Sequence, residues 1–121
     1  MSEMTIYKEF EFDAAHSLTQ VPEGHKCSNL HGHTFKLIVF LRGSINPDRG
    51  WVVDYGEIKE AMEPLLEQLD HAVLNELPGV TNPTSENLCV WIWERLKPAI
   101  PQLCQIELKE TKSSGCIYKG E

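Results

Sequence analysis

Apolar and polar residues alternate along the N-terminal third of the chain. The alternation has a period of two, which is typical of strands with one buried face. It predicts a strand from Ile6 to His16 and, after a loop rich in polar residues, a second strand from His31 to Arg42. The same pattern returns near the C-terminus and predicts two shorter strands, Cys104–Thr111 and Cys116–Tyr118.

The middle of the chain repeats its apolar residues every three or four positions, as amphipathic helices do. This spacing predicts one helix from Tyr55 to Leu69 and another that begins near Thr84 and ends near Pro98. The order is therefore strand, strand, helix, helix, strand, strand. We expect one α+β domain over residues 1–121, with a four-stranded antiparallel sheet and two helices packed on one of its faces.

Composition narrows the class of protein. The chain has 121 residues, with 11 basic and 18 acidic side chains and a net charge of −7. This balance argues against a nucleic-acid-binding protein and against attachment to an anionic membrane surface. No stretch of about 18 apolar residues predicts a membrane span, and the first residues do not resemble a secretory signal. The four cysteines form no Cys-x-x-Cys pair, so we expect reduced thiols and a cytoplasmic location.

Three histidines form the most specific chemical pattern. In His31-Gly32-His33 the two imidazoles project from the same face of the second predicted strand. His16 is the last residue of the first predicted strand, and it lies on the same face as the apolar residues of that strand. If the two strands pair as a hairpin, His16 lies beside the other two. Three histidines with one open position are typical of catalytic zinc; the alternative is three unrelated histidines.

Cys27 precedes His31 by four residues, in the loop expected to lie over the three histidines. Three interpretations are open. Cys27 is a fourth zinc ligand that closes a structural site, an activated thiolate that acts as base or nucleophile, or an inert loop thiol. The spacing between Cys27 and His31 does not decide among them.

Other polar residues stand at positions that suit catalysis or binding. Asp70-His71 ends the first helix and suits a proton-transfer pair, although a helix C-terminus also favours a cation. Glu110 continues an apolar strand face, where its carboxylate accepts N–H groups of a heterocyclic ligand or pairs with a lysine. Thr84 and Ser85 cap the second helix or contact a ligand at its N-terminus.

Taken together, these motifs resemble the family of 6-pyruvoyltetrahydropterin and 6-carboxytetrahydropterin synthases. The resemblance covers nearly the whole chain, and the matching segments occur in the family's order. They are Phe12-Asp13-Ala14-Ala15-His16, Cys27-Ser28-Asn29-Leu30-His31-Gly32-His33, Asp70-His71-Ala72-Val73-Leu74-Asn75, Asn82-Pro83-Thr84-Ser85-Glu86-Asn87-Leu88 and Lys109-Glu110-Thr111.

The resemblance implies a role for the matching residues. Zinc would be the cofactor and the substrate a pterin triphosphate. Glu110 would anchor the pterin ring. The resemblance also implies the tunnelling fold and a homohexamer, a dimer of trimers, with active sites at subunit interfaces. The zinc ligands would be His16, His31 and His33, and the catalytic residues would be Cys27, Asp70 and His71.

Within this family, the gap between the cysteine and His-Gly-His separates the branches. The three residues between Cys27 and His31 resemble the carboxy branch, which acts in queuosine biosynthesis. That branch implies a lyase that converts 7,8-dihydroneopterin triphosphate and water to 6-carboxy-5,6,7,8-tetrahydropterin, acetaldehyde and triphosphate. One alternative is the pyruvoyl branch, which eliminates triphosphate. The other is a non-catalytic zinc protein in which Cys27 closes the site.

Overall fold

The computed structural model describes residues 2–121, with two long strands at their centre. Strand β1 (Glu3–His16) and strand β2 (His31–Ser44) run antiparallel along their whole length. Each is slightly longer than its alternation predicts, because β1 begins before Ile6 and β2 continues past Arg42. The pairing ends with His16 opposite His31, next to the loop of residues 17–30.

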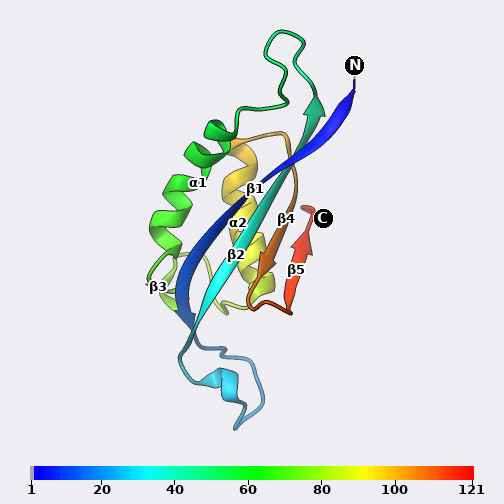
Figure 1. The fold of residues 1–121 in the computed structure, drawn as a ribbon. Helices are drawn as coiled ribbons and strands as arrows, with labels where there is room; N and C mark the ends of the chain where they lie inside the picture. Colours follow the sequence, from blue (N-terminus) through cyan, green and yellow to red (C-terminus); the bar gives the residue numbers. More distant parts are fainter. Residues whose placement is uncertain (1) are drawn as a thin grey trace.

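Two helices cover one face of the sheet (Figure 1). Helix α1 (Tyr55–Leu69) has the predicted bounds and follows Asp54, whose carboxylate accepts a backbone N–H of the first turn. Helix α2 (Ser85–Ala99) follows Thr84, whose hydroxyl oxygen does the same. The apolar sides of both helices meet the inward side chains of the sheet in one core. Its largest fully buried members include Phe12, Phe35, Leu37, Leu41, Ile58, Met62, Leu69, Leu88 and Ile92.

Two further strands extend the sheet beyond β2. Strand β4 (Leu103–Lys109) pairs antiparallel with β2, and strand β5 (Gly115–Tyr118) pairs antiparallel with β4. The register between β2 and β4 shifts between Phe40 and Leu41. The buried face of β4 therefore starts at Leu103 rather than at Cys104, which the simple alternation predicts.

The prediction of four strands in the order ββααββ is wrong in one element. The sheet has five strands, in the spatial order β3-β1-β2-β4-β5. Strand β3 (Ala72–Val73) lies between the helices in sequence and pairs parallel with the end of β1. It has only two residues, too few to show any periodicity. It forms because the N–H of His71 donates to the carbonyl of Asp13 and brings the chain alongside β1.

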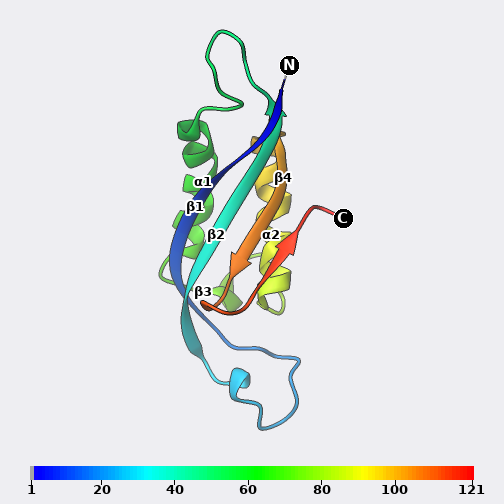
Figure 2. The ribbon, with the colours of Figure 1, turned by 45° about the vertical axis from the view of Figure 1, so that its right-hand side comes forward.

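The loops gather at the two ends of the sheet, as Figures 1 and 2 show. Residues 17–30 project beyond one end and contain a short 3₁₀ turn, η1 (Lys26–Ser28). Residues 45–54 lie at the opposite end. Within residues 2–121, none of the helices has the length and apolar character that crossing a bilayer requires.

Candidate metal centre and active site

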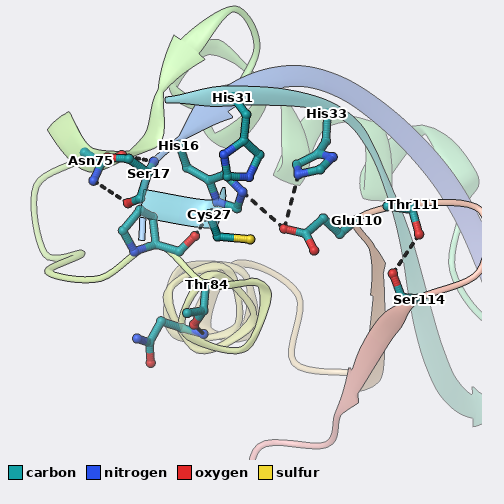
Figure 3. Close-up of polar contacts among 12 residues, drawn as sticks. His16, Ser17, Cys27, His31, His33, Asn75, Thr84, Glu110, Thr111 and Ser114 are labelled. Carbon is teal, nitrogen blue, oxygen red and sulfur yellow. Dashed lines mark hydrogen bonds and ion pairs between the residues drawn. The ribbon is translucent and has the colours of Figure 1, made fainter. Parts of the chain in front are cut away.

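The three histidines lie together where β1 ends and β2 begins. The hairpin register places His16 opposite His31 and Ala14 opposite His33. One ring nitrogen from each histidine lies within 4.8 Å of one from each of the others. The strand pairing that sequence alternation predicts is therefore confirmed, and with it the cluster (Figure 3).

Hydrogen bonds to backbone carbonyls fix the proton on two of the imidazoles. Nδ1 of His16 lies 2.7 Å from the carbonyl oxygen of Pro83, and Nδ1 of His31 lies 2.7 Å from that of Asn29. Because a carbonyl oxygen only accepts, Nδ1 carries the hydrogen in both rings. Nε2 of each neutral ring then presents a lone pair, the form in which imidazole binds metals.

His16 is the most enclosed of the three. Its side chain is 1% exposed, and its Nε2 atom is buried without a hydrogen-bond partner. A buried nitrogen lone pair with no donor facing it is costly unless a cation binds it.

The surroundings of His33 favour its neutral form. Burial lowers the pKa of His33, and the neighbouring His16 and His31 lower it further, against the opposing effect of Glu110. A neutral imidazole is the form that binds a metal ion. The donor set of His16, His31 and His33 therefore fits zinc, which favours imidazole nitrogen ligands.

Glu110 follows β4 directly, and its carboxylate reaches the histidines. Oε1 lies 3.1 Å from Nε2 of His16 and 3.5 Å from Nε2 of His33. The sequence analysis places Glu110 on the apolar side of its strand, as observed. The sequence does not indicate that Glu110 contacts the histidines. That contact depends on the pairing of β4 with β2, which are far apart in the sequence.

Cys27 lies in the 3₁₀ turn η1 and is partly exposed. The turn is fixed by His25, whose Nδ1 accepts the backbone N–H of Cys27 at 3.0 Å. The N–H of Leu18 donates to the carbonyl of Cys27 and ties the two sides of the loop together. Figure 3 shows the sulfur pointing toward the side of the site where Glu110 lies. Cys27 does not belong to the group of side chains whose ligand atoms all lie within 4.8 Å of one another.

Asp70 and His71 form a pair at the end of α1. Oδ2 of Asp70 lies 3.1 Å from Nδ1 of His71, and Oδ1 accepts the backbone N–H of Asp13 at 3.0 Å. The bond from Asp13 is the largest reason that the pKa of Asp70 lies below its ordinary value, followed among the lowering causes by the bond from His71. His71 has a left-handed backbone, with φ of 59°, and its side chain is 80% exposed.

An open cavity of about 490 Å³ extends from the histidine cluster to the end of α1. His33 and His71 both line it, whereas Cys27 and Glu110 do not. Among the described residues, no hydrogen bond or ion pair joins Cys27 to Asp70 or His71. The cavity is lined by Asp13, Ala14, Ala15, Gly32, His33, Thr34, His71, Ala72 and Val73.

Thr84 and Ser85 lie at the N-terminus of α2, directly after the carbonyl of Pro83 that holds His16. Thr84 accepts the N–H of Asn87 at 3.1 Å. The hydroxyl oxygen of Ser85 is buried and has no hydrogen-bond partner.

Two residues that hold this site were not predicted from the sequence. Asn75 accepts the backbone N–H of Ser17 and donates to its carbonyl, at 2.9 and 2.8 Å. Asp13 supports Asp70 through its backbone. Asn75 and Asp13 both stand inside the motif segments quoted above, so position within a motif is the only signal that marks them.

Comparisons with known proteins agree on one family for this chain. A family model described as 6-pyruvoyl tetrahydropterin synthase matches residues 5–121. The chain is 40% identical, over 93% of its length and 91% of the relative's, to a 6-carboxy-5,6,7,8-tetrahydropterin synthase from Synechocystis sp.. It is 38% identical to a dihydroneopterin monophosphate aldolase from Pyrococcus furiosus, over 84% and 81% of the two chains.

A solved structure shares the whole fold. The 6-pyruvoyl tetrahydropterin synthase of Caenorhabditis elegans superposes with a TM-score of 0.93, at 30% identity, over 100% of this chain and 98% of that one.

Proposed function

This chain belongs to the 6-pyruvoyl tetrahydropterin synthase family, and on that basis we propose that it is a zinc-dependent carbon–carbon lyase of queuosine biosynthesis. It converts 7,8-dihydroneopterin triphosphate and water to 6-carboxy-5,6,7,8-tetrahydropterin, acetaldehyde and triphosphate. The observation that carries the proposal is the three-histidine cluster, in which each ring offers a nitrogen within 4.8 Å of the others and Nε2 of His16 is buried. The name of the Synechocystis relative and the three residues between Cys27 and His31 support the carboxy branch.

In this proposal, the metal is held by His16, His31 and His33. Bound zinc supplies Lewis-acid polarisation of the oxygen atoms on the substrate's side chain and favours loss of the protons beside them. The hydrogen bonds from His16 and His31 to backbone carbonyls keep both rings in the ligand form.

The protons are moved by protein groups on two sides of the substrate. The thiolate of Cys27 removes a proton from the substrate's side chain. Asp70 holds the Nδ1–H of His71, which leaves Nε2 of that ring free to exchange a proton on the other side. Loss of these protons expels triphosphate by elimination and leaves two adjacent carbonyl carbons on the side chain. Water then adds to the carbonyl next to the ring, and the bond between the two carbonyl carbons breaks to give the carboxylate and, after protonation, acetaldehyde.

Binding groups hold the pterin so that its side chain meets these residues. The carboxylate of Glu110 accepts two N–H groups of the ring, which fixes the orientation of the substrate. At the start of α2, Thr84 has a hydroxyl hydrogen to donate to a substrate oxygen. Ser85 is the second group assigned to substrate binding there, although its hydroxyl is buried in the single chain and must become accessible to take that role.

Each active site uses residues from two copies of the chain. Within residues 2–121 of one copy, Cys27 makes no polar contact with the Asp70–His71 pair, and the His71 side chain is largely exposed. We therefore assign Cys27 and the Asp70–His71 pair of one site to neighbouring subunits of a homohexamer.

Two other functions make different predictions. Elimination of triphosphate to the pyruvoyl product is favoured by the likeness to the Caenorhabditis elegans enzyme. A closed structural site would need Cys27 as a metal ligand, and the grouping of ligand atoms argues against this. If Cys27 is catalytic, Cys27→Ala keeps zinc and loses turnover. If Cys27 closes the site, the same variant loses zinc.

The test is mass spectrometry of the pterin products formed from 7,8-dihydroneopterin triphosphate by zinc-loaded protein. The Cys27→Ala variant with measured zinc content serves as the control. We expect 6-carboxy-5,6,7,8-tetrahydropterin from the wild type and none from the variant. A pyruvoyl product would move the chain to the other branch. No turnover by zinc-loaded wild type would contradict the enzymatic proposal.

A further inference from the structure

We propose that Cys89 and Cys116 form an intramolecular disulfide when the protein meets a small-molecule disulfide such as glutathione disulfide. The bond ties helix α2 to strand β5 beside the candidate active site and stabilises the folded chain. This modification site involves neither the metal nor the pterin, so it is independent of the proposed reaction.

The two sulfur atoms face each other between α2 and β5. Sγ of Cys89 lies 3.1 Å from Sγ of Cys116, and all four cysteines of the chain are free thiols. A disulfide holds its sulfur atoms about 2.0 Å apart, so each sulfur has to move by only about 0.5 Å. Cys104, by contrast, turns its sulfur toward the carbonyl of Phe40.

A second contact between the same two elements fixes this pairing. Trp93 lies one helical turn after Cys89, and its ring packs edge-on against that of Tyr118, with 5.6 Å between the centroids. Residues i and i+4 share one face of a helix, and residues i and i+2 share one face of a strand. Both contacts therefore follow from one packing of α2 on β5, which lie next to each other in Figures 1 and 2.

The exposure of the two thiols sets the order of the reaction. Cys116 is partly exposed, whereas Cys89 is 2% exposed. The thiolate of Cys116 attacks one sulfur of glutathione disulfide, breaks its S–S bond and releases one glutathione. Cys89 then loses its proton, attacks the sulfur of Cys116 and releases the second glutathione. Two protein thiols are oxidised, the small disulfide is reduced, and the two glutathione thiols take up the two protons.

The environment of the pair determines how fast this reaction runs. Burial raises the pKa of both Cys89 and Cys116 above the ordinary value of a thiol. Because the thiolate is the attacking form, the disulfide forms slowly. The reduced form also gains no stability from a thiolate, so the disulfide is not easily reduced again. Such a pair is a crosslink that accumulates under sustained oxidation.

The bond joins two segments that hold the candidate site. Helix α2 follows Pro83, whose carbonyl oxygen lies 2.7 Å from Nδ1 of His16. Strand β5 follows Ser114, whose carbonyl accepts the N–H of Glu110. The disulfide closes the loop of residues 89–116, and closing a loop restricts the unfolded chain and stabilises the folded one.

Peptide mapping after oxidation tests this inference. The full-length protein is incubated with glutathione disulfide, alkylated and digested with trypsin, which leaves each of the four cysteines in a different peptide. We expect a linked pair of peptides that contains Cys89 and Cys116 and lacks the two thiol hydrogens. Cys89→Ala and Cys116→Ser, made separately, should each abolish this link. Cys104→Ser is the matched control and should keep it.

Thermal unfolding of the same proteins gives a second readout. Oxidation should raise Tm by about 10 °C in the wild type and in Cys104→Ser, because a disulfide that closes a loop of this length adds a few per cent of the entropy of unfolding back to the folded side. Neither Cys89→Ala nor Cys116→Ser should show this rise.

Three results would overturn the inference. The first is glutathione that stays bound to Cys116, or a link between two chains, in place of the internal disulfide. The second is an unreacted pair in protein whose partly exposed Cys27 already carries glutathione, which shows that the oxidant was active. The third is a linked pair with no rise in Tm. None of these readouts needs turnover, so an inactive wild type would contradict the proposed reaction and leave this inference standing.

Discussion

At the scale of single residues, the metal centre depends on hydrogen bonds made by the ring nitrogens that face away from it. The carbonyls of Pro83 and Asn29 receive the Nδ1–H groups of His16 and His31. These bonds orient both rings so that Nε2, the other ring nitrogen, is the atom left to bind the metal.

The first prediction concerns His25, whose ring caps the turn that carries Cys27. His25→Ala removes the acceptor of the Cys27 N–H. Loss of such a cap costs about 1 kcal/mol, which corresponds to roughly a five-fold fall in kcat/KM if the turn must be ordered for catalysis. His25→Asn supplies an alternative cap and should restore most of the activity.

Steady-state kinetics with measured zinc content check this prediction. Zinc content should be the same in wild type and both variants, since His25 lies outside the histidine cluster. If His25→Asn is as impaired as His25→Ala, capping is not what His25 contributes.

A second prediction uses the acidity of Asp70. Its pKa is lowered below the ordinary value of 3.8, chiefly by the N–H of Asp13. A carboxyl group whose pKa is lower in the folded than in the unfolded state stabilises the fold at pH values above the unfolded-state pKa. This stabilisation is lost as the pH falls through the folded-state pKa. The stability difference between wild type and Asp70→Asn should therefore be constant from neutral pH down to about pH 5 and shrink below 3.8.

Urea denaturation at several pH values measures this difference, which should be small because the group is exposed. At neutral pH, Asp70→Asn should also lower kcat by about 10²–10⁴-fold, because His71 loses the carboxylate that orients it. A stability difference that grows as the pH falls below 4 would contradict the assignment.

At the scale of elements, the β1–β2 hairpin is what the sequence predicts best. The alternation of apolar and polar residues predicts both strands and the face on which each side chain lies. It therefore also predicts that His16 lies close to His31. The pattern succeeds because one face is buried along the whole length, so a shift of one residue would bury the polar side chains. Helix α1 is predicted equally well, since its apolar stripe is unbroken.

Features that arise from contacts distant in the sequence could not be predicted. Strand β3 depends on a bond from His71 to Asp13 and on a left-handed residue, and neither leaves a periodic pattern. The contact of Glu110 with His16 depends on the register of β4 against β2, which places Lys109 opposite Lys36. The sequence predicted the candidate ligands themselves, whereas their supporting hydrogen bonds required the structure.

A third prediction concerns the segment that holds the end of β1. Asn75→Ala removes both hydrogen bonds to the backbone of Ser17, the residue after His16. We expect a loss of about 1–3 kcal/mol in unfolding free energy, because partly buried backbone groups lose their partners. Zinc affinity should fall as well, since His16 becomes less firmly held.

Denaturation of the zinc-free protein and chelator competition measure the two effects. Asn46→Ala is the matched control, because the Asn46 side chain likewise makes two hydrogen bonds to backbone groups, here by accepting two N–H groups, but lies in the loop at the other end of the sheet. It should lower stability without changing zinc affinity. Equal zinc affinities for the two variants would mean that Asn75 does not support the metal site.

At the scale of the whole molecule, residues 2–121 cover one face of the sheet with helices and leave the other face without any. Both helices lie behind the strands in Figures 1 and 2. The opposite face and the edge strand β5 expose large apolar side chains, among them Tyr7 and Ile117, at 57% and 58%. An open face and a free strand edge are the features that assembly would cover.

The fourth prediction tests whether sites form between subunits. Cys27→Ala and His71→Ala should each be inactive alone. Co-expressed, they should form mixed oligomers in which about one quarter of the sites combine an intact Cys27 with an intact His71 from a neighbour. Activity near that fraction of wild type would be expected. No recovery in verified mixed oligomers would place both residues of a site in one chain.

The reaction itself is tested most directly by its side products. Zinc-loaded protein is mixed with 7,8-dihydroneopterin triphosphate, and acetaldehyde and triphosphate are quantified together over the course of the reaction. We predict that they appear in equal amounts and at the same rate, because carbon–carbon cleavage and loss of triphosphate belong to one turnover. Triphosphate released without acetaldehyde would contradict the lyase assignment and identify the reaction as a simple elimination.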